Sequence, residues 1–151
     1  MSALLKTSLL MKKLYFLLDL YINPHAILNV HTQEHFMSNT TVADHFKNKP
    51  VPVRAIYDKL LALCKKIGDI TEDPKKTSIH LVRDSALAGI EVRQNYLLLN
   101  IKSDHALVSP RIAKSEQLSA KRYHQKVKLT SPNDVDVELK QWLKEAYGLS
   151  G

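Results

Sequence analysis

Four basic or chargeable side chains alternate along one short segment near the C-terminal end of the chain. They are Arg122, His124, Lys126 and Lys128. On a β-strand, residues two positions apart share a face at a spacing of about 6.6 Å, which resembles the spacing of successive phosphates in a nucleic-acid strand. Such a row would bind a phosphate backbone with salt-dependent, largely sequence-independent affinity, and Tyr96 and Tyr123 would add stacking if exposed. The alternative is an ordinary solvated strand face, which is normally polar.

Histidines offer a second kind of chemistry, acid–base catalysis or anion binding. The chain has seven, but only His80 and His124 fall in expected strands that could be neighbours. With Lys76, Arg83 and Arg111 they would form an anion pocket, although no carboxylate is evident to orient either imidazole as a general base. The sequence assigns no catalytic residue. The candidate anion-binding residues are Lys76, His80, Arg83, Arg111, Arg122, His124, Lys126 and Lys128.

Other chemical motifs carry little weight. The stretch His31-Thr32-Gln33-Glu34-His35 fits the H-x-x-E-H pattern of inverted zincins, but no third ligand stands out downstream. The only cysteine, Cys64, lies on the apolar side of an expected helix, where it behaves as a small hydrophobic residue. We therefore expect no metal and no cofactor. A single thiol also fits a reducing compartment, which predicts a cytoplasmic protein.

Composition sets the size and class of the molecule. The 151 residues are 44% hydrophobic and 25% charged, with a net charge of +7. These values describe one globular domain that can bury a core without disulfides. The positive charge favours an anionic partner such as nucleic acid, a phosphorylated ligand or an acidic protein. A generic basic surface that keeps the protein soluble is the other interpretation.

Two helices must position these residues. Apolar residues recur at three- and four-residue steps over 51–67, with Pro50 and Pro52 at the start and Gly68 at the end, which predicts an amphipathic helix. Over 132–147 the same periodicity follows Ser131, a favourable N-cap, and Pro132, which suits the first turn. A shorter helical turn is expected over 42–46.

Four strands are expected between the two main helices. Residues 77–82 and 121–129 alternate in polarity, and the apolar runs 87–92 and 96–101 are separated by a tight turn, which favours a hairpin. Residues 103–120 are interpreted as a long polar connection. The order indicates an α+β fold with an antiparallel sheet of about four strands. One-sided apolar stripes place both main helices on one face, leaving the other face partly exposed.

The first 36 residues differ from the rest. Lys12 and Lys13 precede an apolar run over 14–22 that contains Asp19, a poor match to a signal peptide and too short to span a bilayer. We interpret 1–36 as an upstream extension with a helix over 3–22, and 42–151 as a single domain. No membrane span is expected, and the oligomeric state is not predicted.

Four stretches of the chain carry a resemblance to a known family. They are Asp44-His45-Phe46 with 49–50 and 53–57, Glu72 to Lys76 with Ile79-His80, Ser109 to Ile112 with Arg122, His124 and Val127, and Trp142 to Tyr147. From about Val42 onward the chain resembles an uncharacterised bacterial family of small α+β domains, a domain of unknown function sometimes labelled a predicted transport protein. The resemblance implies no activity and no cofactor. Leu87, Gln94 and Asn95 depart from the family pattern.

Three functional hypotheses follow. The first is a binding or interaction module that takes nucleic acid or another anionic ligand on the basic sheet face. The second is an enzyme, which requires His80, His124, Lys76 and Arg111 to converge in one concave pocket. The third is a protein–protein interaction module that uses the exposed sheet face or the N-terminal helix.

Overall fold

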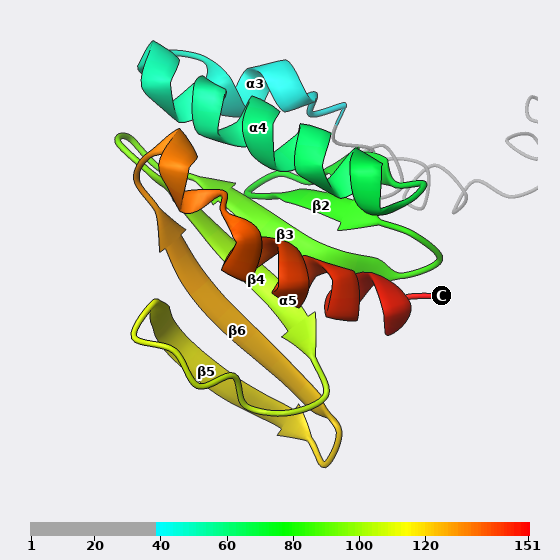
Figure 1. Cartoon of the computed structure of the whole chain (residues 1–151). Helices are drawn as coiled ribbons and strands as arrows, with labels where there is room; N and C mark the ends of the chain where they lie inside the picture. The colour runs from blue at the N-terminus through cyan, green and yellow to red at the C-terminus, as the bar shows by residue number, and fades with distance from the viewer. Residues whose placement is uncertain (1–38) are drawn as a thin grey trace, which may run out of the picture. The chain divides into compact units, whose positions relative to one another are not determined.

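Helices open and close the part of the chain that the structure describes, and six strands lie between them (Figure 1). The structure is a computed structural model and describes residues 39–151. Its elements are α3 (Val42–Phe46), α4 (Val51–Ile67), β1 (Thr71–Pro74), β2 (Ile79–Val82), β3 (Ala86–Val92), β4 (Leu97–Ser103), β5 (Ile112–Ser119), β6 (Arg122–Leu129), a 3₁₀ turn η1 (Pro132–Asp134) and α5 (Val137–Gly148). The expected extension over 1–36 lies outside the described residues. No described helix is long and apolar enough to cross a bilayer.

The strands form one antiparallel sheet in the order β1-β2-β3-β4-β6-β5. The expected α+β fold and antiparallel sheet are confirmed, but the expectation of four strands is wrong. The two additional strands, β1 and β5, are the edges of the sheet. Of these, β1 contains Pro74, which has no backbone N–H to donate to a neighbouring strand. Strand β5 is solvent-exposed along nearly its whole length. Neither therefore shows the alternation that identifies a half-buried strand.

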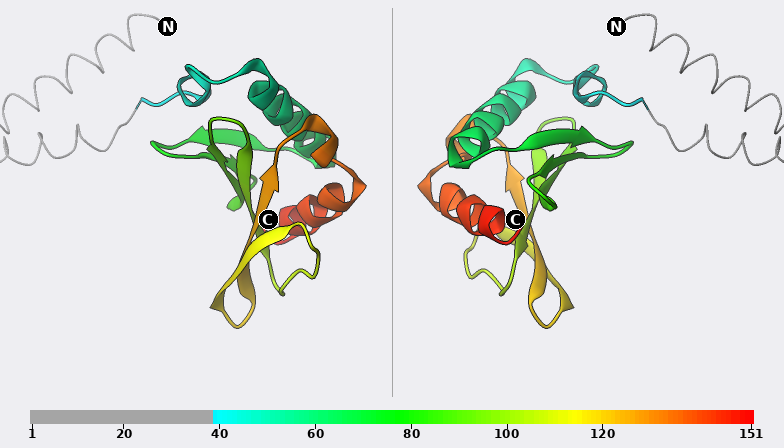
Figure 2. Two further views of the ribbon diagram at one scale, coloured as in Figure 1. Left: turned by 90° about the vertical axis from the view of Figure 1, so that its left-hand side faces the viewer. Right: turned by 90° about the vertical axis from the view of Figure 1, so that its right-hand side faces the viewer.

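Both main helices pack on the same face of the sheet, as the sequence predicts, and Figure 2 shows α4 and α5 on one side. On the central strand β4, Leu97, Leu99 and Ile101 are fully buried against them. Burying a side chain of this size stabilises the fold by about 1.5–3 kcal/mol, so this alternate set anchors the register. Leu98, Asn100 and Lys102 are displaced to the opposite face, which no helix among residues 39–151 covers.

The second main helix starts later than the sequence predicts. Ser131 is an N-cap, but it caps only the 3₁₀ turn, where Asp134 completes a capping box. The α-helix begins at Val137, because the side chain of Asp136 accepts from the backbone N–H of Leu139 and so acts as a second cap. Two good caps within six residues divide the expected helix over 132–147 into a turn and a helix.

Tyr57 joins α4 to the first edge strand. Its side chain is fully buried, and its hydroxyl donates to the Glu72 carboxylate on β1. Burial is the main cause that raises the pKa of Tyr57, and the hydrogen bond to Glu72 adds to it. The ring of Phe46 packs beside it, with centroids 5.0 Å apart. This one side chain therefore connects α3, α4 and β1.

Replacing Tyr57 with Phe should lower the free energy of unfolding by about 1–3 kcal/mol, because a hydrogen bond to a charged group is lost and a partly buried carboxylate keeps no partner. Urea unfolding measured by circular dichroism would check this. Tyr123→Phe is the matched control, since Tyr123 is half-buried on β6, and it should change stability by less than about 0.5 kcal/mol. Equal losses in both variants would contradict the role given to the hydroxyl.

Candidate functional site

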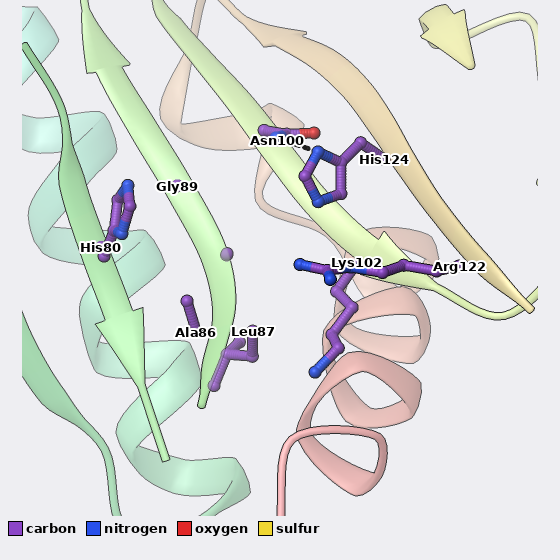
Figure 3. Close-up of a pocket in the computed structure, with 9 residues that line it drawn as sticks. His80, Ala86, Leu87, Gly89, Asn100, Lys102, Arg122 and His124 are labelled. Carbon is purple, nitrogen blue, oxygen red and sulfur yellow. Dashed lines mark hydrogen bonds between the residues drawn. The ribbon is translucent and has the colours of Figure 1, made fainter. Parts of the chain in front are cut away.

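A pocket of about 210 Å³ opens on the face of the sheet opposite the helices. This volume is smaller than the roughly 300–1,000 Å³ of pockets that enclose drug-sized ligands. It suits one compact group, such as a phosphate and the atoms bonded to it. The side chains and backbone that line it are those of His80, Ala86, Leu87, Ala88, Gly89, Asn100, Lys102, Arg122 and His124 (Figure 3).

Cross-strand pairing brings these residues together. His80 on β2 pairs with Gly89 on β3, and Gly89 pairs with Asn100 on β4. One alternation further along β4, Lys102 pairs with His124 on β6. Residues in register, and residues two positions apart, share a face of a sheet. The polar lining therefore comes from two adjacent rungs that cross four neighbouring strands, together with Arg122, which lies two residues before His124 on β6.

Gly89 forms the floor between the two histidine-bearing strands. A Cβ atom at this position would lie 3.5 Å from Cδ2 of His80. That is ordinary van der Waals contact, so the backbone does not require glycine there. What the missing side chain provides is space, because a methyl group would occupy the floor beside the His80 ring.

Asn100 orients His124. Its side-chain amide lies 3.3 Å from Nδ1 of His124, and its Oδ1 is buried without a partner among the described residues. An amide nitrogen only donates, so Nδ1 of His124 is the acceptor of this hydrogen bond. The proton of the neutral imidazole is then on Nε2, and Figure 3 shows this nitrogen on the side of Arg122 and Lys102.

The surroundings of His124 hold it neutral. Burial is the largest cause that lowers its pKa, and the positive charges of Arg122, Lys126 and Lys102 lower it further. The Glu116 carboxylate, which faces His124 from β5, acts in the opposite direction but does not prevail. Since the unperturbed pKa is about 6.5, His124 is uncharged at neutral pH and can accept a proton.

Two cations stand at one end of the pocket. The ammonium of Lys102 donates to Oγ of Ser85 and to the carbonyl of Leu149, both at 3.0 Å. A lysine ammonium has three N–H donors, so one is left for a ligand. Arg122 is exposed beside it. This end can therefore stabilise negative charge, and Lys102 is held in place while it does so.

The remainder of the basic row continues along β6 on the same face. Register places Lys126 opposite Asn100 and Lys128 opposite Leu98. Lys128 also lies over the ring of Tyr96, with Nζ 4.3 Å from the centroid. Tyr123 lies on the other face of β6, the face toward the helices, which it shares with the buried Gln125. The tyrosines thus give weaker support to base stacking than the basic side chains give to phosphate contacts.

Three of the proposed anion-binding residues lie elsewhere. Arg111 has a structural role, because it binds the carboxylates of Asp136 and Glu138 and lies over the ring of Trp142. Arg83 lies over the ring of Tyr147 and donates to its carbonyl, and Lys76 is exposed in the turn between β1 and β2. The convergence expected of the enzyme hypothesis holds for His80 and His124 but not for Lys76 and Arg111.

Sequence reasoning missed Gly89, Asn100 and Lys102. The signal existed in part, because β4 alternates and its even-numbered residues must face away from Leu97, Leu99 and Ile101. The sequence does not indicate which strand lies beside β4. It pairs with β6 across the intervening residues 104–121, and nothing local predicts that pairing.

Other features of the described residues have less chemical potential. A hollow at the end of the sheet is lined by Asp69, Asp84 and Arg83, but its one cation is already engaged with Tyr147. Burial raises the pKa of Cys64 to about 12, so its thiol is not a nucleophile. Among residues 39–151 no group of three His, Cys, Asp or Glu side chains could hold a metal ion.

The His124 pKa gives a direct test of this electrostatic arrangement. A proton NMR titration should place it below the ordinary value of about 6.5. Arg122→Gln should raise it and Glu116→Gln should lower it, because the two charges act in opposite directions. Folded His124 binds protons less readily than unfolded His124. Its contribution to stability should therefore be complete above about pH 6.5 and decline as pH falls toward the folded pKa. Shifts of the same sign in both variants would contradict this account.

Comparison with known proteins gives a family but no activity. A protein-family model described as "Domain of unknown function (DUF5655)" matches residues 42–150. No curated protein and no solved structure matches the chain. The bacterial origin and the transport label stay predictions, while the resemblance to an uncharacterised family is confirmed. With most of its length matched, the chain belongs to the DUF5655 family of domains of unknown function.

Proposed function

We propose that this domain binds a single nucleic-acid strand along the open face of its sheet, with one phosphate held in the pocket. The observation that carries the proposal is the pocket itself, where Lys102, Arg122 and two histidines meet beside the basic row of β6. The remaining row residues, Lys126 and Lys128, extend in line from His124 at the alternate-residue spacing of about 6.6 Å. A single backbone therefore has successive contacts along one strand.

The anionic character of the ligand follows from the donors available. Arg122 and the third N–H of Lys102 offer charge-assisted hydrogen bonds, which are stronger than neutral ones. Carboxylates are fewer on this face: Glu116 is paired with Lys114 at 3.5 Å, and Glu91 with Arg93. A phosphate would thus meet uncompensated positive charge.

A small phosphorylated ligand is the second candidate, because the pocket volume is that of one compact group. A protein partner that adds a strand is less favoured. The exposed edge strand β5 contains two register shifts, and β1 contains Pro74. Bulges and prolines at sheet edges discourage pairing with another chain.

Fluorescence anisotropy with a labelled oligodeoxynucleotide, titrated at several salt concentrations, tests the proposal. Arg122→Gln and Lys126→Gln should each weaken binding and reduce the salt slope by roughly 0.7, the value for one phosphate on a single strand. Lys140→Gln, which changes an exposed lysine on α5, should leave both unchanged. Wild-type affinity no tighter than roughly 10⁻⁴ to 10⁻⁶ M at physiological salt is nonspecific and would overturn the proposal. Equal competition by a mononucleotide would favour the small ligand.

Filling the pocket floor tests whether the pocket takes part. Gly89→Ala should weaken oligonucleotide binding by roughly threefold to tenfold, equivalent to about 0.7–1.4 kcal/mol. Its thermal stability should be unchanged or slightly raised, because glycine within a strand is unfavourable. Gly148→Ala is the matched control, since its Cβ would meet no atom within 4 Å. Identical affinities for the two variants would show that the ligand does not enter the pocket.

A further inference from the structure

The pocket lies at one end of the basic row. Arg122 is the first residue of β6, and Lys126 and Lys128 follow it along the same face of the strand. Before Arg122 the chain turns back from β5, and Lys121 in that turn interacts with the Asp104 carboxylate. A phosphate backbone that enters the pocket therefore finds further lysines in one direction only.

The side of the pocket away from β6 has a different character. It is formed by His80 and by residues 86–89 of β3, whose side chains are small or apolar, and no lysine or arginine lines it. Figure 3 shows His80 and β3 on one side of the pocket and Arg122 and Lys102 on the other. A backbone that continued toward β2 would lose the charge-assisted contacts that the β6 side provides.

Three hydrogen-bond donors come from neighbouring positions on the β6 side. Lys102 is directly opposite His124 in the register, and Arg122 precedes His124 by two residues. Opposite residues have Cβ atoms about 5 Å apart, and alternate residues of one strand are about 6.6 Å apart. Because Asn100 donates to Nδ1 of His124, the ring offers its Nε2–H, while Lys102 offers its third N–H and Arg122 its guanidinium. These positions allow all three side chains to contact one compact group.

The number and charge of these donors match a phosphate monoester better than a phosphodiester. A phosphodiester inside a strand has two free oxygens and a single negative charge. A monoester at a strand end has three free oxygens and a charge between about −1.5 and −2 at neutral pH. Three donors, of which Lys102 and Arg122 are cationic, can pair every free oxygen of the monoester, and no carboxylate side chain lines the pocket to oppose the larger charge.

We infer that the pocket holds the terminal phosphate of a nucleic-acid strand, while the phosphates that follow it lie along Lys126 and Lys128. This inference rests on the proposed function and specifies its ligand: the strand ends in the pocket instead of passing through it. Hydrolysis of a phosphodiester leaves a phosphate monoester on one of the two new ends. The domain would therefore distinguish a cut strand from a continuous one.

Oligonucleotides that differ only at their ends test the inference. Fluorescence anisotropy compares a 5′-phosphorylated strand and a 3′-phosphorylated strand with an unphosphorylated strand one nucleotide longer, which carries the same number of phosphate groups. The fluorophore is linked to an internal base, so both ends stay free. Wild-type protein should bind at least one phosphorylated strand roughly 10- to 100-fold more tightly than the longer strand, the range expected for a hydrogen bond to a charged group.

Two variants separate the pocket from the rest of the row. Arg122→Gln should remove roughly tenfold of the preference for the phosphorylated end. Lys126→Gln should weaken binding of all the strands alike and keep the preference. Arg122 is exposed and makes no side-chain hydrogen bond or ion pair with residues 39–151, so its replacement should leave the fold intact. Thermal unfolding of both variants checks this.

The outcomes distinguish the inference from the proposed function. Equal affinities for the phosphorylated strands and the longer strand would overturn the inference and leave the proposed function intact. A preference that Arg122→Gln leaves unchanged, or that Lys126→Gln removes, would also overturn it. If no strand binds more tightly than the nonspecific range of roughly 10⁻⁴ to 10⁻⁶ M, the proposed function itself fails. A preference for the 5′ phosphate, the 3′ phosphate or both supports recognition of a strand end.

Discussion

The two-sided pleat of β4 is the constraint on which the rest of the structure depends. This strand is paired on both edges, with β3 and with β6, so each side chain is committed to one face. Leu97, Leu99 and Ile101 must face the helices, and Asn100 and Lys102 are thereby carried to the open face. A slip of one residue would exchange the two sets and bury a lysine. The hydrophobic core therefore sets the geometry of the polar pocket behind it.

Local periodicity predicted the elements that are buried on one side. The stripe of α4, the β3–β4 hairpin and the alternation of β6 were all readable, because burial on one face imposes a repeat on the sequence. The edge strands were not, since β5 is exposed on both faces and β1 ends in Pro74. The expected single helix over 132–147 failed for a different reason: Asp136, an ordinary acidic residue in sequence, outcompetes Ser131 as the cap of α5.

The candidate site shows the same division between local and distant information. The shared face of Arg122, His124, Lys126 and Lys128 follows from alternation alone. The role of a given arginine does not, because it depends on partners far away in sequence. Arg111 meets Asp136 more than twenty positions later, and Arg83 meets Tyr147 more than sixty positions later. The sequence does not distinguish Arg111 and Arg83 from Arg122. In the structure, however, both side chains bind groups within the domain itself. Asn100 and Lys102 went unnoticed because their strand appears in sequence as an apolar core segment.

The hydrogen bond from Lys102 to the carbonyl of Leu149 has a consequence beyond positioning. It joins the open face of the sheet to the residue that follows α5, on the opposite face. The neighbouring carbonyl of Ser150 accepts from the backbone of Asp84 and Ser85, so the end of the chain closes around the same ammonium. The same ammonium therefore contacts both the turn between β2 and β3 and the residue that follows α5. If an anion bound to Lys102 changed the stability of these contacts, the contacts would change the affinity for that anion by the same factor. One lysine side chain thus connects the two faces of the sheet.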